Sequence, residues 1–144
     1  MFLGRLENTI DEKGRITFPT RFREILSEGA FITKGFDQNL IIMPSSRWNI
    51  LKERVSKLSL SDEDARALKR QLYSLADKID LDSAGRYLIP IELRKAGHLT
   101  NSAVYVCTGD DIELWNPELL EEQDKGMEDP AQLAKRFAAF DLSI

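Results

Sequence analysis

Two arginines of this 144-residue chain stand in nearly the same local sequence, 71 residues apart. The stretches DEKGRITFP and DSAGRYLIP begin at Asp11 and Asp82, and each places an arginine, Arg15 or Arg86, directly after a glycine. A guanidinium group is a planar fork of donors that suits a phosphate or the O6 and N7 edge of guanine. Each arginine can instead pair with the aspartate four residues before it and hold the turn. The two interpretations are compatible, because an aspartate can orient an arginine that also contacts nucleic acid.

Further basic residues surround the first stretch and could form a DNA-binding patch with it. Lys13 lies two residues before Arg15, and three more arginines are close in sequence: Arg5, Arg21 and Arg23. The second stretch is less basic, since Ala84 aligns with Lys13 and Glu92 aligns with Arg21. We therefore expect the first stretch to carry more of the electrostatic attraction to a polyanion.

The residue pattern disfavours an enzyme. Asp11 and Asp82 could be the carboxylates of an aspartic-protease dyad, but neither is followed by the expected Thr-Gly or Ser-Gly pair, since Glu12-Lys13 and Ser83-Ala84 stand there. The nearby arginines also favour the ionised forms of both aspartates. The single histidine, His98, is interpreted as a loop or helix-end residue, and Cys107 as a core residue of a strand. The glycines form neither a GxxxxGK[ST] nor a GxGxxG loop. We therefore expect no catalytic site, cofactor, metal or small-molecule substrate.

The likeness of the two stretches extends into an internal repeat. At the same offset Arg23 aligns with Arg94, and downstream FITKGFDQNLIIMP resembles VYVCTGDDIELWNP. In each copy an aspartate–glycine turn precedes an alternating strand, a proline that begins a helix, and a hairpin. Each copy is therefore predicted to be a β-α-β-β unit, over residues 5–47 and 76–119. One such unit buries too little apolar surface alone, so we expect the two to pack about a pseudo-twofold axis.

Helices are expected outside the two repeats. In the linker, residues 48–75, apolar residues recur at spacings of three and four, which predicts amphipathic helices, and Ser61 has the context of a capping-box N-cap. The acidic tail, residues 120–144, is also expected to be helical. Further helices are predicted to begin at Asn116 and Asp129, each of which precedes a proline. These helices should cover the core and contribute to contacts between subunits.

Charge is distributed unevenly along the chain. The formal net charge is −4, but residues 101–144 hold three basic and ten acidic side chains, whereas residues 1–100 hold 17 basic and 14 acidic ones. A mildly basic body with an acidic tail does not exclude DNA binding, although it argues against a large uniform basic surface. No apolar run approaches the ~20 residues of a membrane span, and no secretory signal is evident. One cysteine cannot form an internal disulfide, which fits a reducing cytoplasm.

The doubled D-x-x-G-R sequence resembles a known family. MFLGRLENTIDEKGRITFPTRFR at the start, IDLDSAGRYLIPIELRKAG and the later IELWN are similar to the MraZ family of bacterial transcriptional regulators, built from two SpoVT-AbrB-type repeats. The resemblance covers nearly the whole chain. It implies an α+β fold in which two swapped-hairpin repeats form a small β-barrel with flanking helices. It also implies a homo-oligomeric ring that binds repeated short DNA boxes upstream of its own division and cell-wall operon, usually as a repressor.

The resemblance also points to particular DNA-facing residues. The family's DNA-facing residues centre on the two motifs, which correspond here to Asp11, Gly14, Arg15, Asp82, Gly85 and Arg86. Lys13 and the basic residues after the first motif are further candidates, whereas Ala84 leaves the second motif without a lysine. We expect Lys13 and Arg15 to contact DNA directly, Arg86 to assist, and the two aspartates to orient the turns.

The sequence leads to one functional hypothesis and one alternative. The first is a cytoplasmic, nucleoid-associated regulator that binds double-stranded promoter DNA as a homo-oligomeric ring. Several subunits presenting the same patch gain avidity that one mildly basic subunit lacks. The alternative is a ring-forming assembly or partner-binding protein that does not read DNA.

Overall fold

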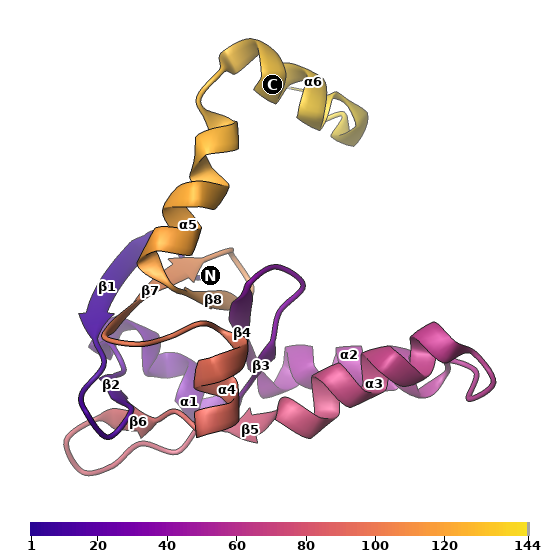
Figure 1. Ribbon diagram of the computed structural model, residues 1–144. Helices are drawn as coiled ribbons and strands as arrows, with labels where there is room; N and C mark the ends of the chain where they lie inside the picture. Colours follow the sequence, from indigo (N-terminus) through magenta and orange to yellow (C-terminus); the bar gives the residue numbers. More distant parts are fainter. Residues whose placement is uncertain (144) are drawn as a thin grey trace.

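The computed structural model describes residues 1–143 as an α+β fold with one large antiparallel sheet and one small one (Figure 1). The six strands of the large sheet are, in spatial order, β1 (Arg5–Thr9), β7 (Ser102–Cys107), β8 (Ile112–Trp115), β4 (Asn39–Pro44), β3 (Ala30–Lys34) and β5 (Asp77–Lys78). The small sheet pairs β2 (Arg15–Thr17) with β6 (Arg86–Leu88). The predicted mixture of strands and helices is therefore confirmed.

The strand order shows how the two sequence repeats are combined. β1, β3 and β4 of the first repeat correspond to β5, β7 and β8 of the second, and the spatial order of the sheet reverses when the repeats are exchanged. β1 pairs with β7 and β5 pairs with β3, so an edge strand from each repeat lies against the hairpin of the other. The repeats are interleaved within one sheet rather than placed side by side.

The expected closed barrel is not confirmed. The large sheet is open, with β1 and β5 at its edges, and β2 and β6 pair with each other instead of extending it. Within residues 1–143 the β-pairing between the two sheets consists of the single bridges Ile10–Ile16 and Leu81–Tyr87, which lie just after β1 and β5. The chain turns at Asp11 and at Asp82, directly after these bridges, so the pairing between the two sheets does not extend further.

One core is shared by both repeats. The predicted alternation is confirmed in the small sheet, where Ile16 and Tyr87 are buried on the face toward the core. The rings of Phe18 and Phe22 pack against Tyr105, with centroids 5.8 and 5.7 Å away. The largest fully buried side chains come from both repeats and, for Leu72 alone, from the linker: Ile16, Phe18, Phe22, Ile32, Leu40, Ile42, Leu72, Ile89, Leu93, Tyr105, Ile112 and Leu114. Burying one sheet face against this core fixes which side of β2 and β6 points outward.

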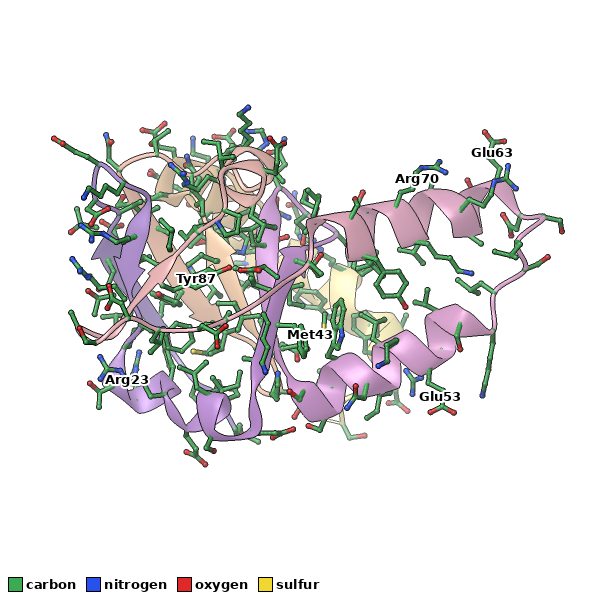
Figure 2. The ribbon with its side chains drawn as sticks, turned by 90° about the horizontal axis from the view of Figure 1, so that it is seen from below. Arg23, Met43, Glu53, Glu63, Arg70 and Tyr87 are labelled. Atoms are coloured by element: carbon green, nitrogen blue, oxygen red, sulfur yellow. The ribbon has the colours of Figure 1, made fainter. Side chains whose placement is uncertain are left out.

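The helices lie around this sheet and in two projections. They are α1 (Glu24–Glu28), α2 (Ser45–Ser56), α3 (Glu63–Leu75), α4 (Ile91–Ala96), α5 (Pro117–Asp124) and α6 (Pro130–Phe137), with short 3₁₀ turns η1 (Thr20–Phe22), η2 (Lys125–Met127) and η3 (Ala138–Phe140). α2 and α3 form a helical hairpin that projects from the body, with Glu53, Glu63 and Arg70 on its outer surfaces (Figures 1 and 2). The segment from α5 to η3 forms a second projection, which we call the arm; it extends from a different side of the body than the hairpin (Figure 1). Among residues 1–143 there is no helix with the length and apolar character that a bilayer crossing demands.

The predicted helix starts are confirmed with one exception. Asn116 and Asp129 cap α5 and α6 by accepting backbone N–H groups of the first turn. The prediction of Ser61 as the N-cap of α3 is wrong, because Asp62 accepts the first-turn N–H groups instead. The Ser61 hydroxyl lies 2.7 Å from that of Ser59. Two adjacent residues were both suitable caps, and the ionised carboxylate is the stronger acceptor.

Candidate nucleic-acid interface

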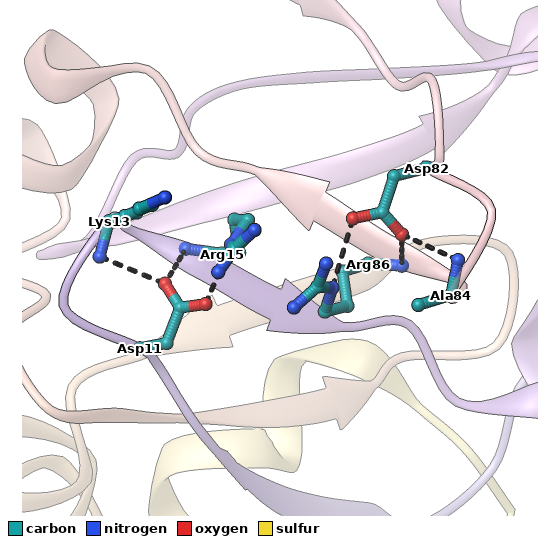
Figure 3. Close-up of polar contacts among 6 residues, drawn as sticks. All are labelled: Asp11, Lys13, Arg15, Asp82, Ala84 and Arg86. Atoms are coloured by element: carbon teal, nitrogen blue, oxygen red, sulfur yellow. Dashed lines mark hydrogen bonds and ion pairs between the residues drawn. The ribbon is translucent and has the colours of Figure 1, made fainter.

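The first D-x-x-G-R motif forms a tight turn that leads into β2. Asp11 Oδ1 accepts the backbone N–H groups of Lys13 at 3.0 Å and Arg15 at 2.9 Å (Figure 3). The Gly14 N–H donates to the Asp11 carbonyl oxygen at 2.9 Å. Gly14 has a φ of +89°, which a residue with a Cβ adopts only with strain. The predicted aspartate turn is confirmed, and it depends on both the carboxylate and the glycine.

The second motif repeats this turn at the start of β6. Asp82 Oδ1 accepts the N–H groups of Ala84 and Arg86, both at 2.9 Å (Figure 3). The Gly85 N–H donates to the Asp82 carbonyl oxygen at 3.0 Å, and Gly85 has a φ of +76°. The two turns therefore use the same bonds at the same four positions.

Each motif arginine pairs with its aspartate through one nitrogen only. Arg15 Nε donates to Asp11 Oδ2 at 2.7 Å, and Arg86 Nε donates to Asp82 Oδ2 at 2.9 Å (Figure 3). Within residues 1–143 the two terminal Nη groups of these arginines make no hydrogen bond, and the side chains are 29% and 35% exposed. The pairing predicted from the spacing is present, yet it leaves the donor fork of each arginine available to a partner.

The carboxylates of both turns are held in the ionised form. The backbone N–H of Arg15 is the main cause that lowers the pKa of Asp11, and the Arg15 side chain adds to it. The backbone N–H of Arg86 has the same effect on the pKa of Asp82. Two ionised carboxylates, each paired with its own arginine, do not make the proton-sharing pair of an aspartic protease. Residues 1–143 also bring together no group of three or more His, Cys, Asp or Glu that could hold a metal ion.

The outward face of the small sheet presents the two arginines side by side. In the antiparallel register Arg15 lies opposite Leu88, and Thr17 lies opposite Arg86. Because side chains alternate along a strand and Ile16 is buried, these four point away from the core. We call them the ribbon face. Directly opposed residues are about 5 Å apart at Cβ and diagonal ones about 7–8 Å, so the two guanidinium groups lie within one small area.

Hydrogen bonds with strands of the large sheet hold the ribbon face in position. The Thr17 carbonyl oxygen accepts bonds from the Tyr105 hydroxyl and from Asn8 Nδ2, both at 2.9 Å. On the other strand the Tyr87 hydroxyl donates to Asp77 Oδ2 at 2.6 Å, and burial together with this bond raises the pKa of Tyr87. These contacts tie β2 to β7 and β1, and β6 to β5. The ribbon face is thus positioned by the large sheet rather than by its own turns alone.

Arg23 fastens the first repeat to the second turn. Its Nε donates to the Phe18 carbonyl oxygen at 3.1 Å, and the Phe18 N–H donates to the Gly85 carbonyl oxygen at 3.0 Å. The Arg23 guanidinium lies so close to Gly85 that a Cβ there would come within 3.0 Å of it. The glycine of the second motif is therefore required both by its backbone angle and by this arginine.

Arg94 makes the reciprocal contact with the first turn. Its Nε donates to the Ile89 carbonyl oxygen at 2.9 Å, and the Ile89 N–H donates to the Gly14 carbonyl oxygen at 3.0 Å. A Cβ at Gly14 would likewise come within 3.0 Å of the Arg94 guanidinium. Each turn thus receives an arginine from the other repeat. The sequence aligns Arg94 with Arg23, but Arg94 was not predicted to be part of the site. That alignment was the signal that could have identified it.

The remaining predicted basic residues do not gather at the turns. Arg5 donates through both Nη groups to Asp124, at 2.6 and 3.1 Å, and this pairing raises the pKa of Arg5. Six extended residues from Arg5 to Asp11 span about 20 Å. Arg21 lies over the Phe22 ring, with Cζ 4.8 Å from its centroid. The candidate patch therefore consists of Lys13, Arg15, Arg23, Arg86 and Arg94, with Arg5 and Arg21 elsewhere.

Comparison with known proteins gives one consistent result. The family model described as "MraZ protein, putative antitoxin-like" matches residues 1–71 and again residues 72–138. The double match agrees with the internal repeat read from the two motifs.

Curated relatives cover most of the chain. A protein of Herpetosiphon aurantiacus named "Transcriptional regulator MraZ" is 38% identical over 143 residues, which is 99% of this chain and 100% of the relative. Proteins of the same name from Roseiflexus castenholzii and Clostridium tetani are 45% identical over 117 residues and 38% identical over 138 residues. These alignments cover 81% and 96% of this chain, and 82% and 97% of the relatives. The similarity spans both motifs and the elements that position them.

Proposed function

The chain belongs to the MraZ family, and we propose that it regulates transcription by binding double-stranded DNA through the ribbon face. The observation that carries this proposal is the pair of arginines, Arg15 and Arg86, each oriented by an aspartate through Nε with its terminal fork unused. Such a fork suits guanine O6 and N7 or a phosphate. No catalytic step, cofactor or small-molecule substrate is part of the proposal.

The shape of the site favours the major groove. That groove is about 12 Å wide in B-DNA and admits a two-stranded β-ribbon. β2 and β6 form such a ribbon, with its apolar face on the core and the arginines on the other. Lys13 stands at the first turn, where it can reach the phosphate backbone while Arg15 lies over the bases. Arg23 and Arg94 flank the turns and add positive charge.

The finer proposal concerns assembly and target. We propose a homo-oligomeric ring that binds repeated short boxes in its own promoter and represses its division and cell-wall operon, in the cytoplasm and on the nucleoid. The repeats at 5–47 and 76–119 would supply the ribbon, with 48–75 and 120–144 outside it. The small excess of positive charge in residues 1–100 supports an assembly, because several tethered patches bind far more tightly than one. The acidic arm leaves the body on the side away from the turns, so it does not oppose DNA there (Figure 1).

A binding titration on the DNA upstream of the gene tests the proposal. Wild type should bind that fragment with a steep salt dependence, whereas Arg15→Ala should lose about 1–3 kcal/mol of binding free energy. Lys52→Ala is the matched control, because it removes one exposed positive charge on α2, outside the patch. It should bind like wild type.

Two results would contradict the proposal. If wild type ignores the fragment at low salt, DNA binding fails and the ring-forming alternative without DNA gains support. If Arg15→Ala unfolds the protein while residual folded protein keeps its DNA affinity, the arginine serves the turn alone. Thermal unfolding of each variant, measured beside the titration, separates these cases.

A further inference from the structure

The C-terminal arm exposes an apolar face that nothing in residues 1–143 covers. None of residues 125–143 is buried, although α6 is amphipathic and capped by Asp129. Apolar side chains of α6 and η3, with Leu142 after them, line an open hollow of about 550 Å³. The Phe137 and Phe140 rings stack beside it with centroids 6.2 Å apart. An amphipathic helix gains most of its stability from packing, so this face is suited to a partner.

The second projection, the hairpin of α2 and α3, exposes two leucines at its tip. Leu58 and Leu60 follow α2, in the short connection to α3, and are 39% and 73% exposed. Val55 and Leu72 are buried in the two helices, whereas both leucines keep apolar surface exposed at the end of the hairpin. The end of the hairpin that carries these two leucines lies away from the body (Figure 2).

The two projections carry opposite charge. Residues 45–75 hold seven basic and four acidic side chains, whereas residues 117–143 hold three basic and seven acidic ones. Two of these charges are already paired within the body, Arg47 with Asp111 and Asp124 with Arg5, and leaving them out changes neither sign. At the tip itself the signs are reversed, since residues 57–64 hold one basic and three acidic side chains, whereas α6 ends with Lys135 and Arg136. Charge therefore complements both along the two projections and at the tip, which favours and orients contact between an arm and a hairpin.

A single chain does not bring its own two projections together. In Figure 1 the arm stands on one side of the body while the hairpin tip extends away on another. α6 lies against its own neighbours η2 and η3. The occupant that matches the arm in both charge and apolar character is therefore the hairpin of a second copy.

We propose that the hairpin tip of one copy, with Leu58 and Leu60, seats on the apolar face of the arm of the next. The proposal rests on the homo-oligomer proposed above and names the contact that builds it. Tip and arm are different surfaces, so the contact is head-to-tail, and repetition of such a contact closes a ring when the rotation allows it. The ribbon face lies outside both surfaces and stays open to DNA.

Mixing two variants tests this contact directly. A tip variant carries Leu58→Glu and Leu60→Glu, and an arm variant carries Phe137→Glu and Leu142→Glu. Each should fall from the wild-type oligomer to a 16.4 kDa monomer in light scattering coupled to gel filtration. Mixed in equal amounts they should form a heterodimer, because the intact arm of one accepts the intact tip of the other. Phe36→Glu, at a 78%-exposed site on the β3–β4 turn, is the control and should keep the wild-type mass.

The outcomes separate this contact from the ring itself. If wild type is monomeric at micromolar concentration, the ring fails and this contact with it, whereas the DNA titration still tests the ribbon face. If wild type is oligomeric and both variants keep its mass, the ring stands and this contact is overturned. If both variants are monomeric but give no heterodimer, the head-to-tail arrangement is overturned. Circular dichroism of each variant confirms that the body is folded.

Discussion

The turn at Asp11 and the turn at Asp82 share their backbone and differ in their surface. Both use one carboxylate to accept two N–H groups, one glycine at positive φ and one Nε contact from the arginine. At the second position after the aspartate the first turn has Lys13 and the second has Ala84. On the ribbon face the first strand has Thr17 where the second has an exposed Leu88.

This difference separates two roles that the motif combines. Residues that build the turn are the same in both copies, because both turns must start a strand and receive an arginine from the other repeat. Residues that only face outward are free to differ. We therefore expect changes in the turn to affect both copies equally in stability, and changes on the surface to affect them unequally in DNA binding.

The largest expected effect comes from the motif glycines. Gly14→Ala and Gly85→Ala should each destabilise the fold by about 1–3 kcal/mol, because each forces a side chain to positive φ and displaces a cross-repeat arginine. Urea unfolding of the two variants should show losses of similar size.

Gly109 offers a matched control for this comparison. It has a φ of +91°, but a Cβ there would meet nothing within 4 Å. Gly109→Ala should therefore cost less than either motif variant, since it carries the backbone strain without the clash. A loss at Gly85 far below that at Gly14 would break the equivalence of the turns, and a loss at Gly109 equal to both would remove the arginine from the explanation.

Features that depend on near neighbours in sequence could be predicted. The aspartate turns, the alternation of Ile16 and Arg15 between core and surface, and the caps Asn116 and Asp129 each follow from residues within a few positions. The capping prediction failed only at Ser61, where the next residue is an equally suitable cap. Local hydrogen bonding has few alternatives, and short stretches of sequence specify it well.

Features that join distant residues could not be predicted. The contact of Arg94 with Gly14 and the pairing of Arg5 with Asp124 join residues that are far apart in the chain. Arg5 was predicted to be part of the basic patch, but the structure shows that it forms a salt bridge with Asp124 of α5. The sequence likewise did not predict that the large sheet would stay open, because pairing between strands depends on tertiary geometry more than on the composition of each strand.

The next effect is on DNA binding and uses the lysine that only one turn carries. Lys13→Ala should weaken DNA binding about five- to tenfold at 0.1 M salt and reduce the slope of log K against log salt by about 0.9. Ala84→Lys should strengthen binding and steepen the slope. The Lys13 side chain makes no hydrogen bond within residues 1–143, so neither change should alter the free energy of unfolding by more than about 0.5 kcal/mol.

This pair of variants also sharpens the role of the second turn. If Ala84→Lys leaves the salt slope unchanged, the second turn does not approach the phosphate backbone, and the first turn alone supplies the attraction. If Lys13→Ala has no effect on binding, the inequality between the two turns has no electrostatic basis. The double exchange, Lys13→Ala with Ala84→Lys, should return the slope to the wild-type value only when both turns lie on DNA.

The smallest expected effect is a pH dependence that the two turns share. The pKa of each aspartate is lowered in the fold from an ordinary value of 3.8, mainly by the backbone N–H of Arg15 or Arg86. A lowered pKa means that the stabilisation is fully present above 3.8 and is lost as the pH falls through the folded value. Asp11→Asn and Asp82→Asn should each be slightly less stable than wild type at neutral pH, and this difference should shrink below pH 3.8.

Urea unfolding between pH 2.5 and 7 measures that difference for each variant. Because both carboxylates are solvent-exposed and make the same bonds, the two curves should coincide within error. A gap that persists at the lowest pH would mean that the shape of the side chain, and not its charge, holds the turn. A gap at Asp11 only would show that the nearby Lys13 contributes to the turn itself, and the division between shared backbone and unequal surface would then no longer hold.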